Sequence, residues 1–128
     1  MSPLFGKSEL KLAQEAAAQA EIERLKRVSI NDLAVLLLPG FGPEGANKGR
    51  SLRVQQLCTW LVRDFPTAGK FNPLQLLGPV REGLQKLEHA ELVYSTPREN
   101  VSIWRITRLG ETALAERTIE QYVNGREA

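Results

Sequence analysis

The stretch that decides the fold is VREGLQKLEHAELVYSTPRENVSIWRITRLGETAL, residues 80–114. Its first part repeats apolar residues at helical spacing and predicts a helix over residues 79–90. Two β-rich segments follow, residues 92–94 and 101–106, and the second has the two-residue alternation of a strand. The residues between them, 95–100, have turn chemistry, with a proline suited to the first central position of a turn. The stretch therefore predicts a helix followed by a β-hairpin. The helix is expected to bury Val80, Leu84 and Leu87, with Gly83 allowing close approach of a neighbouring element.

The chain before this stretch predicts three helices and a glycine-rich loop. Residues 8–27 are rich in alanine and predict the first helix. Residues 29–38 predict a second helix, which a serine can cap and which a Pro-Gly pair stops. Residues 40–50, GFGPEGANKGR, contain four glycines and a proline and are expected to form a mobile loop. Residues 51–65 return to clear helical periodicity and predict the main core helix.

Two short connections join the deciding stretch to its neighbours. Pro73 suits the first position of a short helix. Gly78 and Pro79 are expected to interrupt that helix, so that Pro79 opens the next one. On the other side, residues 107–110 pass the chain to one last helix, where Gly110 is expected to permit a tight turn. In that last helix the expected contact residues are Leu114, Tyr122 and Val123.

The first helix carries a shallow apolar face made of small side chains. Such a face packs closely against another helix, either from the same domain or from a second copy of the protein. The length fits a single domain over residues 1–128. Within it, residues 1–28 are expected to form an arm for packing or dimerisation, and residues 29–124 a winged core with its C-terminal helix. The face of the arm consists of Leu10, Ala13, Ala17 and Ala20, and Ile22 and Leu25 extend it only by drifting sideways.

Composition and charge exclude several classes of protein. The formal net charge is +2 and the sequence pI is about 8.9, which is compatible with nucleic acid but well below the charge of a dedicated basic binder. The single cysteine, Cys58, cannot form an internal disulfide, and no stretch approaches the roughly 20 apolar residues that span a bilayer. The N-terminal residues also lack the features of a secretion signal. We therefore expect a cytoplasmic protein with no membrane partner.

The residues needed for common catalytic and cofactor sites are scarce. His89 is the only histidine, so a histidine-based metal site or a Ser-His-Asp triad has few candidate partners. The glycine-rich segment lacks the Gly-Lys-Ser or Gly-Lys-Thr order of a phosphate-binding loop. We therefore expect a protein that is not an enzyme, with no cofactor and no metal.

Helix, turn, helix, strand, turn, strand and helix is the element order of a winged helix-turn-helix. The expected fold class is mostly α with a small β-hairpin, namely a winged helix-turn-helix with extra N-terminal and C-terminal helices. About a third of the chain also resembles winged-helix regulators of the MarR and PadR type. The resemblance is carried by VREGLQKLEHAELV (residues 80–93), by the polar wing STPREN (95–100) and by ITRLGETAL (106–114). It implies a wing followed by a handover to a helix and, as function, DNA binding.

We accordingly expect a transcriptional regulator that binds double-stranded DNA as a homodimer through its terminal helices. The helix 79–90 would enter the major groove, with the wing 95–100 beside it. Gln85 is suited to read adenine and Arg81 to read guanine. Arg98, expected at the wing tip, is suited to a minor groove or to a phosphate. The complete set of expected DNA-binding residues is Arg81, Gln85, Lys86, Arg98, Lys70, Arg50 and Arg53.

A second hypothesis comes from a different class of function. The same fold can serve as a protein–protein interaction module without DNA-binding activity, because fold does not determine function. It is suggested by the apolar residues Leu76 and Leu77 before the recognition helix and by the acidic Glu82 on it. The partner in that case is another protein.

Overall fold

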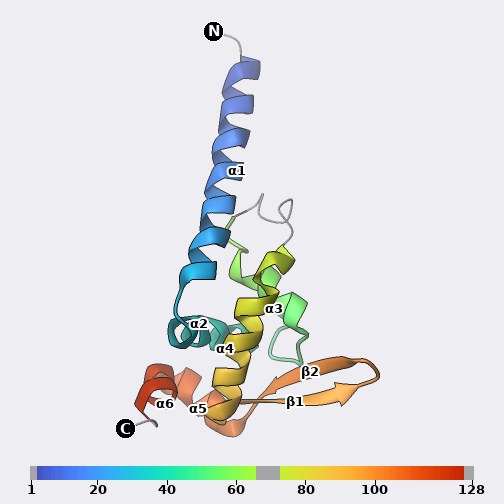
Figure 1. The fold of residues 1–128 in the computed structure, drawn as a ribbon, viewed down its shortest axis with the longest axis vertical. Helices are drawn as coiled ribbons and strands as arrows, with labels where there is room; N and C mark the ends of the chain where they lie inside the picture. The colour runs from blue at the N-terminus through green and yellow to red at the C-terminus, as the bar shows by residue number, and fades with distance from the viewer. Residues whose placement is uncertain (1–2, 66–72, 126–128) are drawn as a thin grey trace.

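Helix α4 (Leu77–His89) lies at the centre of the fold, with α2 (Ile30–Leu37) and α3 (Val54–Leu61) packed against it. The computed structural model describes residues 3–65 and 73–125, which are mostly helical with one two-stranded antiparallel hairpin (Figure 1). The remaining elements are α1 (Pro3–Arg27), η1 (Leu38–Phe41), η3 (Pro73–Leu76), β1 (Val93–Arg98), β2 (Val101–Ile106), α5 (Arg108–Glu116) and α6 (Ile119–Gly125), where η denotes a 3-10 helix.

The contact between α2 and α4 is close because a glycine lies in it. Val80, Leu84 and Leu87 of α4 are fully buried, as the sequence predicted. A Cβ atom at Gly83 would lie 2.6 Å from Cδ1 of Leu37, which is shorter than any tolerated carbon contact. The prediction that Gly83 permits close approach is therefore confirmed. Because Gly83 has no side chain, Leu37 of α2 packs directly against the backbone of α4.

The start of α4 differs from the prediction. The helix begins at Leu77, directly after η3, and continues through Gly78 and Pro79 without interruption. Proline is compatible with this position because the N–H groups of a helix's first turn have no partner inside the helix. Pro79 therefore neither ends the preceding segment nor opens a new helix.

Helix α3 is shorter than predicted, because the residues expected at its start pair with the hairpin instead. The backbone of Leu52 is paired with that of Trp104 in β2, through N–H···O bonds of 2.8 and 2.7 Å. The helix itself begins at Val54, and residues 62–64 form a turn in place of a last helical turn. The pair at Leu52 adds a short third segment to the edge of the hairpin, so the hairpin is tied to the chain just before α3.

The hairpin is present as predicted, but its strands are longer and its turn is tighter. In the register Val93 lies opposite Ile106 and Arg98 opposite Val101, which leaves only Glu99 and Asn100 as the turn. Glu99 has a positive φ of 59°, the conformation such short turns require. Pro97 lies inside β1, which is an edge strand. Proline lacks a backbone N–H, but at this position that group would not form a hydrogen bond to β2. Arg98 is therefore the last strand residue and not part of the turn.

The C-terminal region consists of two helices where one was predicted. Thr107 caps α5, accepting a hydrogen bond from the Gly110 backbone N–H at 2.9 Å, and its hydroxyl donates to the Glu91 carbonyl at 2.7 Å. The helix stops at Arg117, which adopts a left-handed conformation with φ 59°, and α6 begins two residues later. Val123 is buried, whereas Leu114 and Tyr122 are half-buried. An arginine carries no sequence signal for such a break, since glycine is the usual residue there.

Gly110 is needed for a different reason from the predicted one. Its φ is not in the left-handed region; Gly49 is the one glycine with a positive φ among the described residues. A Cβ atom at Gly110 would instead lie 2.1 Å from the carbonyl oxygen of Leu92. The glycine therefore permits close packing of α5 on the chain that enters β1.

The face by which α1 packs on the domain agrees with the predicted stripe only in its extension, Ile22 and Leu25. Ala18, Ile22 and Leu25 are buried, whereas Leu10 is 61% exposed. The predicted alanines Ala13, Ala17 and Ala20 are also exposed. In Figure 1 the N-terminal part of α1 extends away from the rest of the fold. Within residues 3–65 and 73–125, no helix combines the length and apolar character needed to cross a membrane.

The glycine-rich loop is built from turns that pack on the fold. It starts with a 3-10 turn in which Gly40 and Phe41 are buried. The Ala46 N–H donates to the Gly40 carbonyl at 2.8 Å, and the Asn47 side chain donates to the Ser51 carbonyl at 2.7 Å. A Cβ atom at Gly45 would overlap the Gly40 backbone, which explains a glycine there. The abundance of glycine in this loop thus serves close packing as well as turning.

Candidate functional site

The outer face of the hairpin carries arginines and no carboxylate. Side chains alternate across a strand, so Tyr94 and Arg98 of β1 share one face with Arg105 of β2, opposite the face of the buried Trp104. Arg98 and Arg105 are exposed, and Tyr94 is 41% exposed and directly opposite Arg105. The face consists of Tyr94, Thr96, Arg98, Val101, Ile103 and Arg105.

A groove lies between this face and the start of α3, and we call it the hairpin groove. Its volume is about 710 Å³, and arginines from two elements line it, Arg53 before α3 and Arg98 from β1. Gln56 is held in place because its side-chain oxygen accepts the Arg53 backbone N–H at 2.9 Å. No acidic residue lines the groove, which makes it a local concentration of positive charge. Its lining consists of Asn47, Ser51, Leu52, Arg53, Gln55, Gln56, Arg98 and Ile103.

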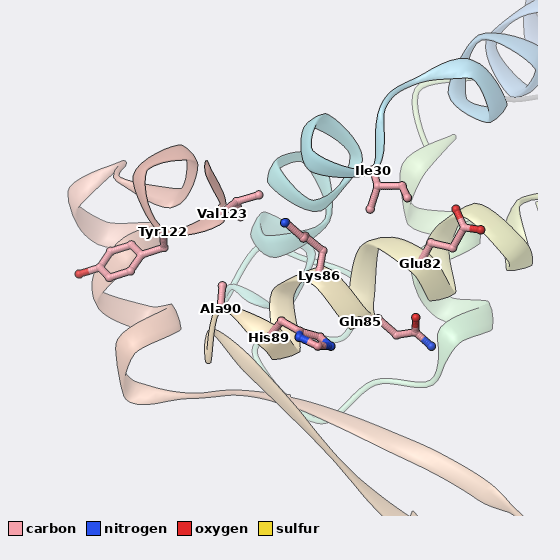
Figure 2. Close-up of a pocket in the computed structure, with 8 residues that line it drawn as sticks. All are labelled: Ile30, Glu82, Gln85, Lys86, His89, Ala90, Tyr122 and Val123. Atoms are coloured by element: carbon pink, nitrogen blue, oxygen red, sulfur yellow. The ribbon is translucent and has the colours of Figure 1, made fainter. Parts of the chain in front are cut away.

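A second hollow lies on the outer side of α4, between α2 and α6, and has a volume of about 570 Å³. Figure 2 shows Lys86 extending toward α2, while Gln85 and His89 lie along the opposite edge of α4. Glu82 lies one turn nearer the start of the helix. Tyr122 and Val123 of α6 and Ile30 of α2 complete the wall (Figure 2). Gln85 and Lys86 thus belong to one surface, and Arg53 and Arg98 to another.

The charges on the outer side of α4 balance. Arg81 and Lys86 contribute two positive charges, and Glu82 and Glu88 contribute two negative ones, so the net charge is zero. All except Lys86 are exposed; Lys86 is half-buried. The hairpin face, rather than α4, holds the unbalanced positive charge.

No family model, no curated protein and no solved structure matches the chain.

The remaining expected residues are Arg50 and Lys70, and Arg50 borders the hairpin face near the paired residues Tyr94 and Arg105. Arg50 lines a third hollow of about 400 Å³ together with Tyr94, Arg105 and Glu111. Lys70 lies outside the described residues. Arg105 was not among the expected site residues, although the alternation in residues 101–106 already placed it on the same face as Val101 and Ile103. The strand period is therefore the signal that would have found it.

The apolar approach to α4 is part of the core. Leu76 is 1% exposed and Leu77 is half-buried, so neither presents a docking surface. This removes one reason for the interaction-module hypothesis. The described residues also contain no group of three histidines, cysteines or acids placed to hold a metal ion.

Cys58 is shielded from reagents by its position in the core. Burial raises the pKa of its thiol from 9.0 to about 11, because removal from water disfavours the charged thiolate. We expect no labelling by a thiol-reactive disulfide reagent at pH 8 in the native protein, and one thiol per chain after denaturation. Because the folded-state pKa is the higher one, this group's stabilising contribution is complete below pH 9 and is lost as the pH rises from 9 toward 11. Rapid stoichiometric labelling of the native protein would show that α3 is not packed as described.

Proposed function

We propose that this protein binds duplex DNA and acts as a transcriptional regulator, with the hairpin face supplying most of the affinity. The observation that carries the proposal is the grouping of Arg53, Arg98 and Arg105 on one side of the hairpin. The groove brings Arg53 and Arg98 together without a carboxylate, and Arg105 lies on the same hairpin face, where it shares a hollow with Arg50 and Glu111. Phosphate contacts from arginine and lysine supply most of the sequence-independent affinity of DNA-binding proteins. Tyr94, directly opposite Arg105, adds a side chain of a type that hydrogen-bonds phosphate oxygens in protein–DNA complexes.

The element order supports a winged-helix arrangement. Helices α2, α3 and α4 are followed by the hairpin, and Leu52 pairs with β2 ahead of α3. In this proposal α4 enters the major groove, with Gln85 and Arg81 as the side chains that contact bases. The hairpin then contacts the sugar-phosphate backbone through Arg98, with Arg53 at the start of α3 beside it. Most of the binding affinity thus comes from the hairpin face. The base sequence is recognised by α4, whose positive and negative charges balance.

Salt dependence is the test that separates DNA binding from its alternatives. We expect duplex affinity to fall steeply as salt is raised, since each neutralised phosphate contributes about 0.9 to the slope of log affinity against log salt. The single substitutions Arg53→Ala and Arg98→Ala should each lower that slope by about 0.9. Fluorescence anisotropy with a labelled duplex at several salt concentrations measures both quantities.

A matched control separates local contacts from net charge. Lys11→Ala removes one exposed positive charge from α1, on the part of the helix that extends away from the hairpin (Figure 1). This variant should retain the wild-type slope. Lack of duplex binding even at low salt overturns the proposal, and equal slopes for all the variants would exclude the hairpin groove as the contact.

The balanced charge of α4 favours one competing function, a protein–protein interaction module. Glu82 and Glu88 are exposed on the outer side of the helix, where they would face phosphates if α4 entered a groove. A protein partner recognised through α4 would be captured in equal amounts before and after nuclease treatment. Its binding would be lost on charge reversal at Glu82 and kept on charge reversal at Arg98. That pattern, with no affinity for duplexes, would replace the DNA proposal.

A further inference from the structure

An apolar pocket lies where α5 packs beside the glycine-rich loop, apart from the hairpin groove and from α4. Its volume is about 480 Å³, within the range of about 300–1,000 Å³ that is typical of small-molecule sites. Its apolar walls include Phe41 of η1, Ile106 at the end of β2 and Leu114 of α5. Phe41 is buried, and the other two are half-buried. Among the described residues that line the pocket, Glu111 alone carries a charge.

The apolar pocket continues into the hollow of about 400 Å³ that Arg50 and Arg105 line. The two share Gly49, Ile106 and Glu111 as lining residues. Gly49 has a positive φ of 81°, a conformation that residues with a side chain rarely adopt. The boundary between the two hollows therefore carries no side chain at this position. We call the combined space the two-part cavity.

Charges of both signs line the two-part cavity, and they do not neutralise one another directly. Over residues 3–65 and 73–125, no ion pair joins Glu111 to Arg50 or Arg105, and all three side chains are exposed. A simple organic anion in the apolar pocket would be repelled by the carboxylate of Glu111. A simple amine would be repelled by the two guanidinium groups. The cavity therefore favours a ligand that carries both charges next to an apolar group.

We propose that the two-part cavity binds a free α-amino acid with a large apolar side chain, of the size of leucine or phenylalanine. The ligand's ammonium group pairs with Glu111, and its carboxylate pairs with Arg105 and Arg50. Arginine is well suited to this contact, because its planar guanidinium donates two parallel hydrogen bonds to a carboxylate. Both charged groups of an α-amino acid are attached to one carbon atom, which also carries the side chain. The apolar side chain can thus occupy the pocket of Phe41 and Leu114 while both charges are paired.

The first test is isothermal titration calorimetry of the full-length protein with L-leucine and L-phenylalanine. We expect a Kd below about 1 mM for at least one of them. Two analogues of leucine each lack one charge: 4-methylpentanoate has no ammonium group, and leucinamide has no carboxylate. Each should bind at least about tenfold more weakly, because a charged group of the cavity is left without its partner. No binding of either amino acid at about 10 mM, or equal affinity for either analogue, would overturn the proposal.

Substitutions in the cavity test the assigned contacts. Glu111→Gln and Arg105→Gln should each lower the affinity for the amino acid at least about tenfold. Both side chains are exposed, so the thermal stability of the variants should stay close to that of the wild type. The matched control Glu116→Gln removes an exposed carboxylate of the same helix that lines neither hollow, and it should retain the wild-type affinity. Unchanged affinity in Glu111→Gln, or an equal loss in the control, would overturn the assignment.

The position of the ligand can be measured by the shifts of backbone amide signals in nuclear magnetic resonance spectra. On addition of L-leucine we expect the largest shifts at Gly42, Gly49 and Ala115, which line the apolar pocket. Shifts confined to the hollow of Gln85 and His89 would place the ligand elsewhere and overturn the proposal. All of these measurements use the protein without DNA, so their outcome is independent of the proposed function.

Discussion

Replacement of Gly110 by alanine is expected to lower the free energy of unfolding by at least about 3 kcal/mol, the upper range for overpacking in a core. The new Cβ atom would lie 2.1 Å from the Leu92 carbonyl oxygen and 2.6 Å from Cγ1 of Ile106. The Leu92 oxygen cannot move aside, because it accepts the Thr107 backbone N–H at 3.0 Å. The overlap therefore requires α5 to move away from the start of β1. Since small domains are stable by only about 5–15 kcal/mol, the loss is a large part of the total.

Thermal unfolding followed by circular dichroism measures this effect, with an expected fall in Tm of roughly 10 °C or more. Gly78→Ala is the matched control. It lies in the first turn of α4, and an added Cβ atom meets nothing within 4 Å. That variant should be as stable as the wild type or more stable by up to about 1 kcal/mol, the difference in helix propensity. Equal stability of the two variants would mean that α5 does not pack on Leu92 as described.

The elements that the sequence predicted well are those set by local patterns. The spacing of Val80, Leu84 and Leu87 and the strand alternation in residues 101–106 each depend on neighbours within one element. Both are confirmed, and Ser29 caps α2 as predicted, accepting the Asp32 backbone N–H at 3.2 Å. Local spacing determines which face of an element is apolar. It does not determine where an element ends when a distant segment competes for its backbone.

The errors lie where long-range contacts decide the outcome. The pairing of Leu52 with Trp104 joins segments about fifty residues apart, so no periodicity in α3 could predict its late start. In α1, both apolar faces have helical spacing, and the sequence alone could not tell which of them the domain covers. The break at Arg117 depends on a left-handed conformation that arginine does not signal. Each of these requires knowledge of what lies opposite the segment in space.

The same distinction applies to the candidate site. The cationic residues were recognisable by type, and the alternation of β2 would have added Arg105. Which of them act together depended on the register of the hairpin and on the Leu52 pairing, which bring Arg53 and Arg98 to one groove. Gln85 and Lys86 lie on another surface, whereas Arg50 lines a hollow next to the hairpin face together with Arg105. The sequence thus indicated a set of residues, and the structure divides it between the hairpin side and the outer side of α4.

The double substitution Arg53→Glu/Arg98→Glu is expected to lower duplex affinity about a hundredfold or more at low salt. Each position loses a favourable contact and gains repulsion from the phosphates, and like-charge juxtaposition at an interface costs several kcal/mol. The loss should be similar for every duplex sequence, because phosphate contacts carry no sequence information. The slope of log affinity against log salt should fall by about 1.8, twice the value for one contact. Both side chains are exposed, so the thermal stability of the variant should remain close to that of the wild type.

A control with the same change in net charge makes the result specific. Lys11→Glu/Arg117→Glu alters two exposed positive charges on α1 and at the end of α5, neither of which lines the hairpin groove. If affinity depended on the overall charge of +2 alone, the two double variants would be equally impaired. If the groove holds a phosphate, only the first loses its affinity, because screening limits the effect of distant charges to about 8 Å at physiological salt. Equal losses of duplex affinity would therefore show that the groove contributes only through the overall positive charge. A loss in the first variant alone would place the backbone of the duplex between α3 and the hairpin.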